Sequence, residues 1–582
     1  MSASQSASPL PSPLPSPSIP PLGQGFRQNL RFDAVAGFLV FLIAMPLCLA
    51  IARASGYPPI AGIWTAVIGG IMCTFLSNSE LTIKGPAAGL IVIVFGAVSE
   101  LGNEFGAGKS DAEKALLGYR LALGIGVTAG VIQIIFGLIR AGKLIDFFPL
   151  TPVHGMLAAI GVIIISKQVY EVIGVAPKKG AGPLDLLSQL PSAIGNLNPE
   201  IAAIGLVSLV ILFGFPFIPF KAIGKMPAQL FVLIVAIGLG FAFDLDHQHT
   251  YLFPSHFFDS ENPDSFEVGP RFLVEMPHVL EDPSSAFAWP LFDGLATQTG
   301  LTYLLLFSLI GSLESLLSAK AVELLDPWRR KTNFNRDLLA VGLANTLASA
   351  VGALPMISEI VRSKANLDNG ARTRYANGFH GLFLLAFVLL FPGLIHQIPL
   401  AALGAMLVYT GFRLASPKEF VRTYRVGSEQ FIVFVGTVLA TLATDLLIGI
   451  GVGVALKILF HIWNGVPLKS FLKADVDVVS EGDELAVIVV KRAAIFSNWL
   501  GMRDVILKQA ETRNKIIVDL SLTKLVDHSV MEKLNQLEQE FHEVGKELSV
   551  IGLEEHTPMA KHPLSARKNR SPKRSGEVAK VS

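Results

Sequence analysis

The chain has 582 residues, of which 51% are hydrophobic and 16% charged, and its formal net charge is +1. Soluble domains average about 25% charged residues, so the composition indicates a membrane protein and gives no reason to expect a nucleic-acid partner. The two cysteines, Cys48 and Cys73, lie inside apolar runs, which argues against a disulfide framework and against a cysteine metal cluster.

The chain begins with a segment rich in proline and serine, residues 1–26, which contains SASPLPSPLPSPSIPPLG. No basic region leads into an apolar run there, so the segment lacks the pattern of a cleaved signal. Its composition predicts a disordered, extended tail. A transmembrane domain is predicted to follow over residues 27–465.

Apolar segments follow one another through this domain, and a membrane-spanning helix needs roughly 20 apolar residues. The pattern predicts fourteen spans. Their ranges are 33–53, 58–76, 86–99, 115–139, 152–170, 201–217, 227–243, 296–319, 336–352, 356–367, 376–395, 398–413, 428–444 and 446–463. Two of them, 86–99 and 356–367, are too short to cross a membrane alone.

The charges of the connecting loops predict the orientation, because cytoplasmic loops are enriched in Lys and Arg. With the N-terminus inside, the basic residues of the loops predicted inside are Arg140, Lys143, Lys221, Lys225, Arg329, Arg330, Lys331, Arg336, Arg372, Arg374, Arg413, Lys418, Arg422 and Arg425. The loops predicted outside are largely acidic, above all residues 244–293. An even number of spans therefore places both termini in the cytoplasm, and the protein in the plasma or inner cell membrane.

The character of the chain changes after the last span. Segments 484–492, 514–521 and 547–553 have the pattern of short buried strands, and 531–544 that of an amphipathic helix. This alternation predicts a small cytoplasmic α/β domain over residues 466–558. The basic segment 559–582 is predicted to be a disordered tail that can touch anionic lipid.

Two prolines break the third and tenth predicted spans. Residues TIK precede GPAAGL in the third span, and GALP precedes MISEIVRSKAN in the tenth. Helices that begin after Pro86 and Pro355 would present free backbone N–H groups, which attract anions. Fourteen spans divide into two repeats of seven, in which the third and tenth correspond. Because seven is odd, the repeats must be inverted, as in transporters with a binding site at the membrane midplane.

The eighth predicted span carries an ionisable residue, Glu314, flanked by Ser312, Ser315 and Ser318. A carboxyl group inside a membrane is costly and by default indicates function. Two roles follow from the residue types: coupling to a proton or sodium ion, or hydrogen bonding to the serines in helix packing.

Several motifs in their order along the chain resemble the SulP family of inorganic anion transporters. They are MPLCLAIARASGYPPIAGIW, GPAAGL, SLIGSLESLLSA, NFNRDLLAVGLANTLASAVGALP, IVRSKANLDNGART and IPLAALGAML. The segment IIVDLSLTKLVDHSVMEKL resembles the STAS domain that is usual at the C-terminus of this family.

The resemblance implies a fold of fourteen spans in two inverted repeats, with a core domain that moves against a gate domain, often within a homodimer. It also implies an anion site at the two helix starts. The residues carried over to that site are Gly85, Pro86, Ala87, Ala88, Met356, Ile357 and Ser358. Glu314 and Ser318 take the places of the family's coupling site, and with Ser358 they form a candidate sodium site.

Three residues depart from the family pattern. Leu47 replaces the usual glutamine, Lys84 precedes the third helix, and Glu359 follows Pro355, where many members have a small residue. Three roles are open for Lys84: a pair with Glu359 across the site, direct binding of the anion, or snorkelling to the interface. Arg362 either adds positive charge to the site or pairs with Glu359 at i,i+3.

The sequence and the resemblance together predict secondary-active transport of a small inorganic anion, bicarbonate or sulfate, by symport with sodium or protons. No enzymatic activity and no cofactor beyond the coupling ion are predicted. Two alternatives remain: a nucleobase or carboxylate transporter of the same architecture, and a membrane-anchored signalling protein whose STAS-like domain binds a cytoplasmic regulator.

Overall fold

The computed structural model describes residues 26–143, 149–178, 181–217, 227–250, 267–328, 330–481 and 484–569. The predicted N-terminal tail lies outside the described residues except for Phe26, which begins the first helix. Residues 570–582 also lie outside them.

Each predicted span corresponds to a helix of the structure. The first seven are α1 (Phe26–Ala54), α2 (Pro59–Leu76), α3 (Ile91–Phe105), α4 (Asp111–Leu138), α6 (Leu150–Val172), α8 (Pro199–Gly214) and α9 (Ala228–Ala242). The second seven are α10 (Gln298–Leu325), α11 (Phe334–Ala350), α12 (Ile360–Asp368), α13 (Tyr375–Leu390), α15 (Leu400–Leu414), α17 (Ser428–Ala443) and α18 (Leu446–Trp463). Long apolar runs make such elements the most predictable part of the chain.

The third span is longer than predicted. A short 3-10 turn, η1 (Ala88–Leu90), leads into α3, and together they form a continuous helix of 18 residues, long and apolar enough to cross a membrane. Within the described ranges, nine helices meet that criterion, whereas α12 has only nine residues. The polar residues after Val98 stay helical, which the hydropathy pattern did not indicate.

Short elements that the hydropathy pattern missed connect the spans. They are η2 (Ala141–Lys143), α7 (Pro183–Gly195), η3 (Phe215–Phe217), the strands β2 (His249–Thr250) and β3 (Glu267–Val268), η7 (Pro270–Phe272), η8 (Pro283–Ala286), η9 (Asp293–Ala296), α14 (Pro392–His396), α16 (Pro417–Val426) and α19 (Lys469–Leu472).

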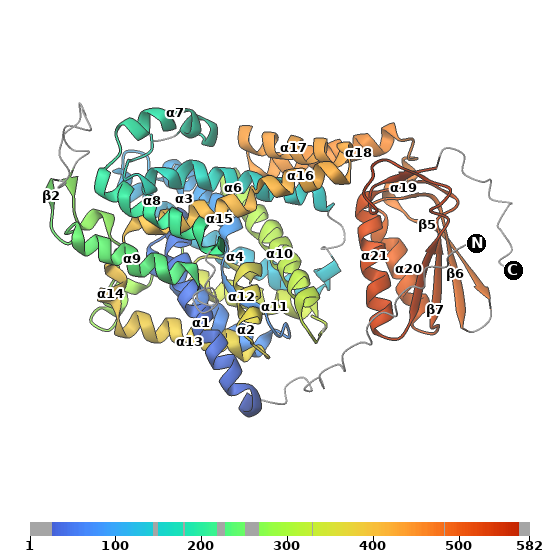
Figure 1. Ribbon diagram of the computed structural model, residues 1–582, viewed down its shortest axis with the longest axis horizontal. Helices are drawn as coiled ribbons and strands as arrows, with labels where there is room; N and C mark the ends of the chain where they lie inside the picture. The colour runs from blue at the N-terminus through green and yellow to red at the C-terminus, as the bar shows by residue number, and fades with distance from the viewer. Residues whose placement is uncertain are drawn as a thin grey trace, which may run out of the picture.

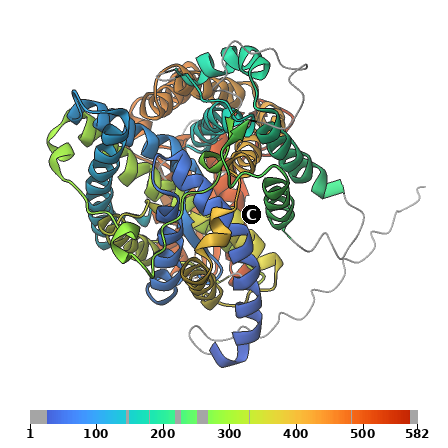
Figure 2. The same ribbon diagram turned by 90° about the vertical axis from the view of Figure 1, so that its left-hand side faces the viewer.

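The helices pack in two groups. In one group, α2, α3, α4, α10, α11 and α13 contact one another, and α1 packs on α2 and α13. In the other, α6 packs on α8, α15, α17 and α18. Figure 1 shows α6, α8, α17 and α18 along the upper side and α1, α2 and α13 along the lower side. Figure 2 shows the same helical part from the end opposite the C-terminal domain.

A two-stranded antiparallel sheet lies where the two proline breaks meet. Strand β1 (Ile83–Pro86) pairs with β4 (Met356–Glu359), with Lys84 opposite Ser358 and Gly85 opposite Ile357. Antiparallel pairing of the third and tenth spans agrees with two inverted repeats. All side chains of β1 are buried.

This sheet corrects the predicted helix starts. Met356, Ile357 and Ser358 are extended and do not form the first turn of a helix; α12 begins at Ile360, and the third helix begins at Ala88. A residue before proline is pushed into extended conformation, which explains the break at each proline. The length of the extended segment depends on pairing between two chain segments that are far apart in sequence.

The C-terminal domain contains a mixed sheet and two helices, α20 (Trp499–Ala510) and α21 (His528–Glu543). Its strands are β5 (Asp475–Glu481), β6 (Leu485–Ala494), β7 (Lys515–Asp519), β8 (Thr523–Val526), β9 (Glu547–Ile551), β10 (Thr557–Pro558) and β11 (Arg567–Lys568). The order is β10-β11-β8-β6-β7-β9, and β5 pairs with β6. Strand β6 is parallel to β7 and β8, and β7 is parallel to β9.

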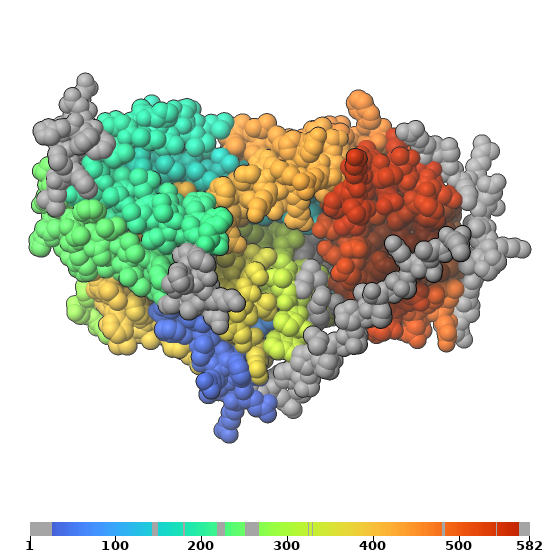
Figure 3. All heavy atoms as spheres, in the orientation of Figure 1, coloured from blue at the N-terminus to red at the C-terminus, as the bar shows by residue number. Residues whose placement is uncertain are grey.

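The predicted C-terminal end of this domain, residue 558, was too early in the chain. Residues 559–569 were assigned to a disordered tail, yet β11 pairs with both β10 and β8. The basic composition of this segment masked its pairing. In Figure 3 the domain forms a lobe at one end of the helical part.

An ion cluster joins this domain to the end of α10, the helix that carries Glu314. Lys320 contacts both Glu323 of its own helix and Glu540 of α21. Lys331 lies 3.4 Å from Glu323 and 3.8 Å from Glu540. Burial alone would raise the pKa of Glu540, but Lys320 and Lys331 outweigh that effect and hold its pKa below the usual range.

We expect acid to loosen this contact between the domains. A carboxylate with a depressed pKa stabilises its contact above the ordinary glutamate value of about 4.3, and that stabilisation is lost as the pH falls through the depressed pKa. The distribution of distances between spin labels on α21 and α13 should broaden in the wild type when the pH falls below about 4. Glu540→Gln should show broadened distances already at neutral pH, while the exposed Glu538→Gln should match the wild type. Equal distances in Glu540→Gln and the wild type at every pH would contradict the expectation.

Candidate functional site

The side chain of Lys84 is buried and fully paired. Its Nζ donates to Asp337 Oδ1 at 2.7 Å, to Asp337 Oδ2 at 3.0 Å and to Ser358 Oγ at 2.5 Å. Asp337 lies in the first turn of α11 and also accepts a hydrogen bond from Ser77 Oγ at 2.5 Å. Both partners of the ion pair are about 1% exposed. An ammonium group has three donors, and these contacts occupy them.

The predicted pair between Lys84 and Glu359 is therefore wrong, and the partner is Asp337. Lys84 stands opposite Ser358 in the ladder, whereas Glu359 stands opposite Ile83. Successive side chains of a strand point to opposite faces, so Lys84 and Glu359 face away from each other. Burial excludes snorkelling, and the occupied donors exclude direct binding of an anion by Lys84 in this conformation.

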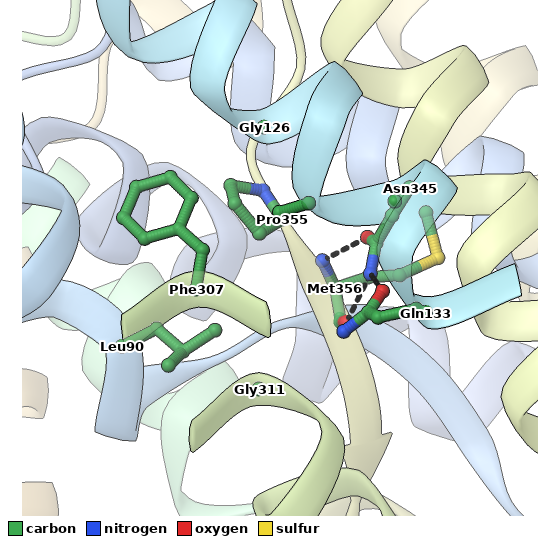
Figure 4. Close-up of a pocket in the computed structure, with 10 residues that line it drawn as sticks. Leu90, Gly126, Gln133, Phe307, Gly311, Asn345, Pro355 and Met356 are labelled. Atoms are coloured by element: carbon green, nitrogen blue, oxygen red, sulfur yellow. Dashed lines mark hydrogen bonds between the residues drawn. The ribbon is translucent and has the colours of Figure 1, made fainter. Parts of the chain in front are cut away.

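The backbone of β4 offers fewer donors than predicted. Met356 N donates to Asn345 Oδ1 at 2.6 Å, and Ser358 N donates to Ser315 Oγ at 3.1 Å. Figure 4 shows Asn345 bonded to both Met356 backbone groups and to Gln133, beside a small cavity of about 10 Å³. Met356 and Ser358 thus use their N–H groups inside the protein, and the predicted backbone site is reduced to the start of the third helix.

The start of the third helix lies against the carboxyl group of Glu314. A Cβ placed on Gly89 would lie only 1.7 Å from Glu314 Oε1. Any other residue at this position would displace the carboxylate, so the glycine is required by the close approach. Glu314 Oε2 has no hydrogen-bond partner among the described residues. The sequence prediction placed Glu314 on its helix but did not identify Gly89 as its neighbour.

The guanidinium group of Arg362 lies against β1 near the same helix start. A Cβ on Gly85 would lie 2.4 Å from Arg362 Nη1, and Nη1 donates to Cys48 Sγ at 3.4 Å. Arg362 is 1% exposed. Its Nε and one oxygen of Glu359, Oε1, have no hydrogen-bond partner in the described part of the chain. Both predicted roles of Arg362, added positive charge at the site and a pair with Glu359, stay predictions.

The candidate sodium ligands separate into two places. Glu314 and Ser318 both line a cavity of about 960 Å³ between the transmembrane part and the C-terminal domain. Ser358 is bonded to the Lys84 ammonium and to Ser315 Oγ at 3.2 Å, so a cation there would be repelled. The inclusion of Ser358 in the candidate sodium site was therefore wrong, and a site at Glu314 and Ser318 stays a prediction.

The geometry thus places Arg362 against Gly85, before the start of the third helix, and Glu314 against Gly89, just after it, and assigns Lys84 to a structural ion pair. Two residues outside the predicted site, both on α11, bind the paired strands β1 and β4. Asp337 accepts from the Lys84 ammonium, and Asn345 bonds to the backbone of Met356. An acidic residue at the start of a predicted span, as Asp337 is, could have been identified as a candidate partner for Lys84.

A family model described as the sulfate permease family matches residues 30–437. The chain is similar to the putative sulfate transporter YvdB of Bacillus subtilis, with 27% identity over 436 residues, covering 75% of this chain and 74% of that protein. It is also similar to the bicarbonate transporter BicA of Picosynechococcus sp., with 25% identity over 457 residues, covering 78% and 74% of the two chains.

Two solved structures share the fold. The transmembrane domain of a cyanobacterial bicarbonate transporter BicA matches with a TM-score of 0.58 at 23% identity, covering 73% of this chain and 98% of that one. The murine anion transporter Slc26a9 in its inward-facing state matches with a TM-score of 0.61 at 16% identity, covering 90% and 86%. The second match extends over the C-terminal domain, in agreement with a STAS fold. The chain therefore belongs to the sulfate permease (SulP) family of anion transporters.

Proposed function

We propose that this protein is a secondary-active transporter of a small inorganic anion, bicarbonate or sulfate. The observation that carries the proposal is the buried guanidinium of Arg362. Its Nη1 lies against Gly85, just before the third helix, and its Nε has no hydrogen-bond partner among the described residues. A buried cation close to the N-terminal end of a helix suits a small anion. Relatives of the chain are named as sulfate and bicarbonate transporters, which supports both substrates.

The proposed coupling group is Glu314, with Ser318 one turn along the same helix. Glu314 has a free buried oxygen and lies against Gly89 at the anion site. A sodium ion bound by Glu314 and Ser318, or a proton on Glu314, would offset the charge of the anion nearby. Binding of the anion and of the cation would then favour each other.

We propose that the protein lies in the plasma or inner cell membrane. Both termini and the STAS-like domain would then lie in the cytoplasm. The 960 Å³ cavity, which reaches Glu314 and Ser318, would then be the cytoplasmic access path. The similarity to an inward-facing structure supports this assignment. We further propose a homodimer as the working assembly, and binding of a cytoplasmic regulator to the STAS-like domain.

The test is uptake of radiolabelled bicarbonate, sulfate and chloride into proteoliposomes under separate sodium and proton gradients, with uracil as a competitor. We expect saturable uptake of bicarbonate or sulfate that one gradient accelerates. Glu314→Gln should abolish the acceleration by the gradient. Ser308→Ala, whose hydroxyl bonds back to Leu304 O of its own helix, should keep it. Unchanged acceleration in Glu314→Gln would refute the coupling role, and inhibition by uracil would favour a nucleobase transporter.

A further inference from the structure

We infer that Lys167 of α6 is a second cation of the anion path and binds the transported anion in the outer half of that path. The outer half is the part of the transmembrane domain on the side opposite the C-terminal domain. The inference rests on the proposed anion transport and deepens it, because it names the residue that receives the anion when the outer half is open.

The directions of two helices place Lys167 in the outer half. His154 near the start of α6 lines the cavity beside the C-terminal domain, and Lys167 lies about 20 Å further along the same helix. Phe95 of α3 lies about 10 Å beyond Ala88, the start of the third helix. The next helix, α4, returns to the cavity, since Gly142 just after α4 lines it. Helix α3 therefore runs away from the cavity, and Phe95 lies on the outer side of the third-helix start.

The Lys167 ammonium lies on the ring of Phe95, with Nζ 3.7 Å from the ring centroid. This contact crosses the boundary between the two helix groups, because α3 belongs to one group and α6 to the other. A second contact crosses the boundary at the same end of α6, where Arg53 Nη2 of α1 lies 3.4 Å from Glu171 Oε1. The two contacts close the outer half, while the cavity at the opposite side reaches Glu314.

The ammonium has a ring beside it but no acceptor. Lys167 is half-buried, and no hydrogen bond or ion pair joins it to another described residue. Glu171, the carboxylate of α6 one turn further along, is paired with Arg53. A cation inside a membrane is costly and by default indicates function. A ring offsets that charge only in part, whereas an anion can accept from the three donors of the ammonium.

Opening of the outer half would exchange the ring for the anion. When the two helix groups separate on this side, Phe95 and Lys167 part, and the ammonium faces the gap between α6 and the third helix. The pair of Arg53 and Glu171 must part as well. Its side chains are 42% and 34% exposed, and exposed pairs contribute little to stability, so this closure can open and close again during transport.

Removal of the Lys167 charge should weaken binding from the outer side. Lys167→Met keeps the length of the side chain, and we expect KM for sulfate or bicarbonate offered on that side to rise about tenfold, the effect of one lost hydrogen bond to a charged group. Lys167→Arg keeps the charge and should recover most of the affinity. The matched control is Lys178→Met, which removes an exposed lysine just after α6 and lowers the net charge equally.

The experiment measures uptake of the labelled anion into sealed vesicles that carry the C-terminal domain inside, so that the outer side faces the medium. Lys167→Cys adds a test of the charge after folding is complete. A methanethiosulfonate reagent in the medium attaches an aminoethyl group to the thiol, which rebuilds a cation, or a sulfonatoethyl group, which brings an anion. We expect the aminoethyl group to lower KM towards the wild-type value and the sulfonatoethyl group to raise it further. The wild type is treated in parallel, because Cys48 and Cys73 are buried thiols.

The outcomes separate this inference from the proposed function. A KM of Lys167→Met within about threefold of the Lys178→Met value overturns the inference and leaves anion transport intact. Equal effects of the two reagents on Lys167→Cys, including no effect of either, overturn it as well, and this holds even if Lys167→Met fails to fold. Absence of saturable anion uptake by the wild type refutes the proposed function, and the inference falls with it.

Discussion

Lys84→Met is expected to destabilise the folded protein by about 3–5 kcal/mol, because it leaves the Asp337 carboxylate buried and without its cation. The ion pair joins β1 to the first turn of α11, and Ser77 and Ser358 complete its hydrogen bonds. A lower thermal midpoint of the detergent-solubilised protein, with a loss of well-folded material on expression, is the expected observation.

A second substitution distinguishes the partner of Lys84. Lys84→Met with Asp337→Asn should recover part of the stability, because the uncompensated charge is gone while a hydrogen-bond acceptor remains for Ser77. Lys84→Met with Glu359→Ala should recover none, since Glu359 lies on the other face of the strand. Recovery of stability by the Glu359 substitution and not by the Asp337 substitution would contradict the structure.

Arg362→Ala is expected to weaken binding of the anion by about 100-fold or more. A hydrogen bond to a charged group contributes about 1.5–3 kcal/mol, and a guanidinium can donate two parallel bonds to an oxyanion. Arg362→Lys should recover only part of the affinity, because an ammonium lacks the planar fork. Equilibrium binding of radiolabelled sulfate to the purified protein measures both effects.

The matched control for this prediction is Arg336→Ala. Arg336 is an exposed arginine at the start of α11 whose Nε donates to Leu76 O, so its removal lowers the net charge equally without touching the site. A dissociation constant for Arg362→Ala within about threefold of the control would show that the guanidinium does not bind the anion.

The membrane spans could be predicted from sequence because their signal is local. A run of about 20 apolar residues has few alternatives to a helix in a membrane. The same argument placed Glu314 inside α10 and the breaks at Pro86 and Pro355. It could not give the bounds of α12, because the four extended residues before it are held by β1, which lies more than 260 residues earlier in the chain.

The partner of Lys84 could not be predicted for a similar reason. Asp337 is 253 residues away in the sequence, and the choice between Asp337 and Glu359 depends on the register of a four-residue strand. A shift of one residue would turn Lys84 towards the opposite face. The close approaches of Glu314 to Gly89 and of Arg362 to Gly85 also depend on packing between distant segments, although both glycines belong to the segment that the sequence had singled out.

The most direct test of the anion site is counterflow, in which vesicles loaded with unlabelled bicarbonate or sulfate take up the labelled anion without any cation gradient. Counterflow reports exchange through the site itself and does not depend on which ion is coupled. We predict labelled uptake by the wild type that requires the internal anion and is lost in Arg362→Ala. Absence of counterflow for both anions, or full counterflow in Arg362→Ala, would contradict an anion site formed by Arg362 and the start of the third helix.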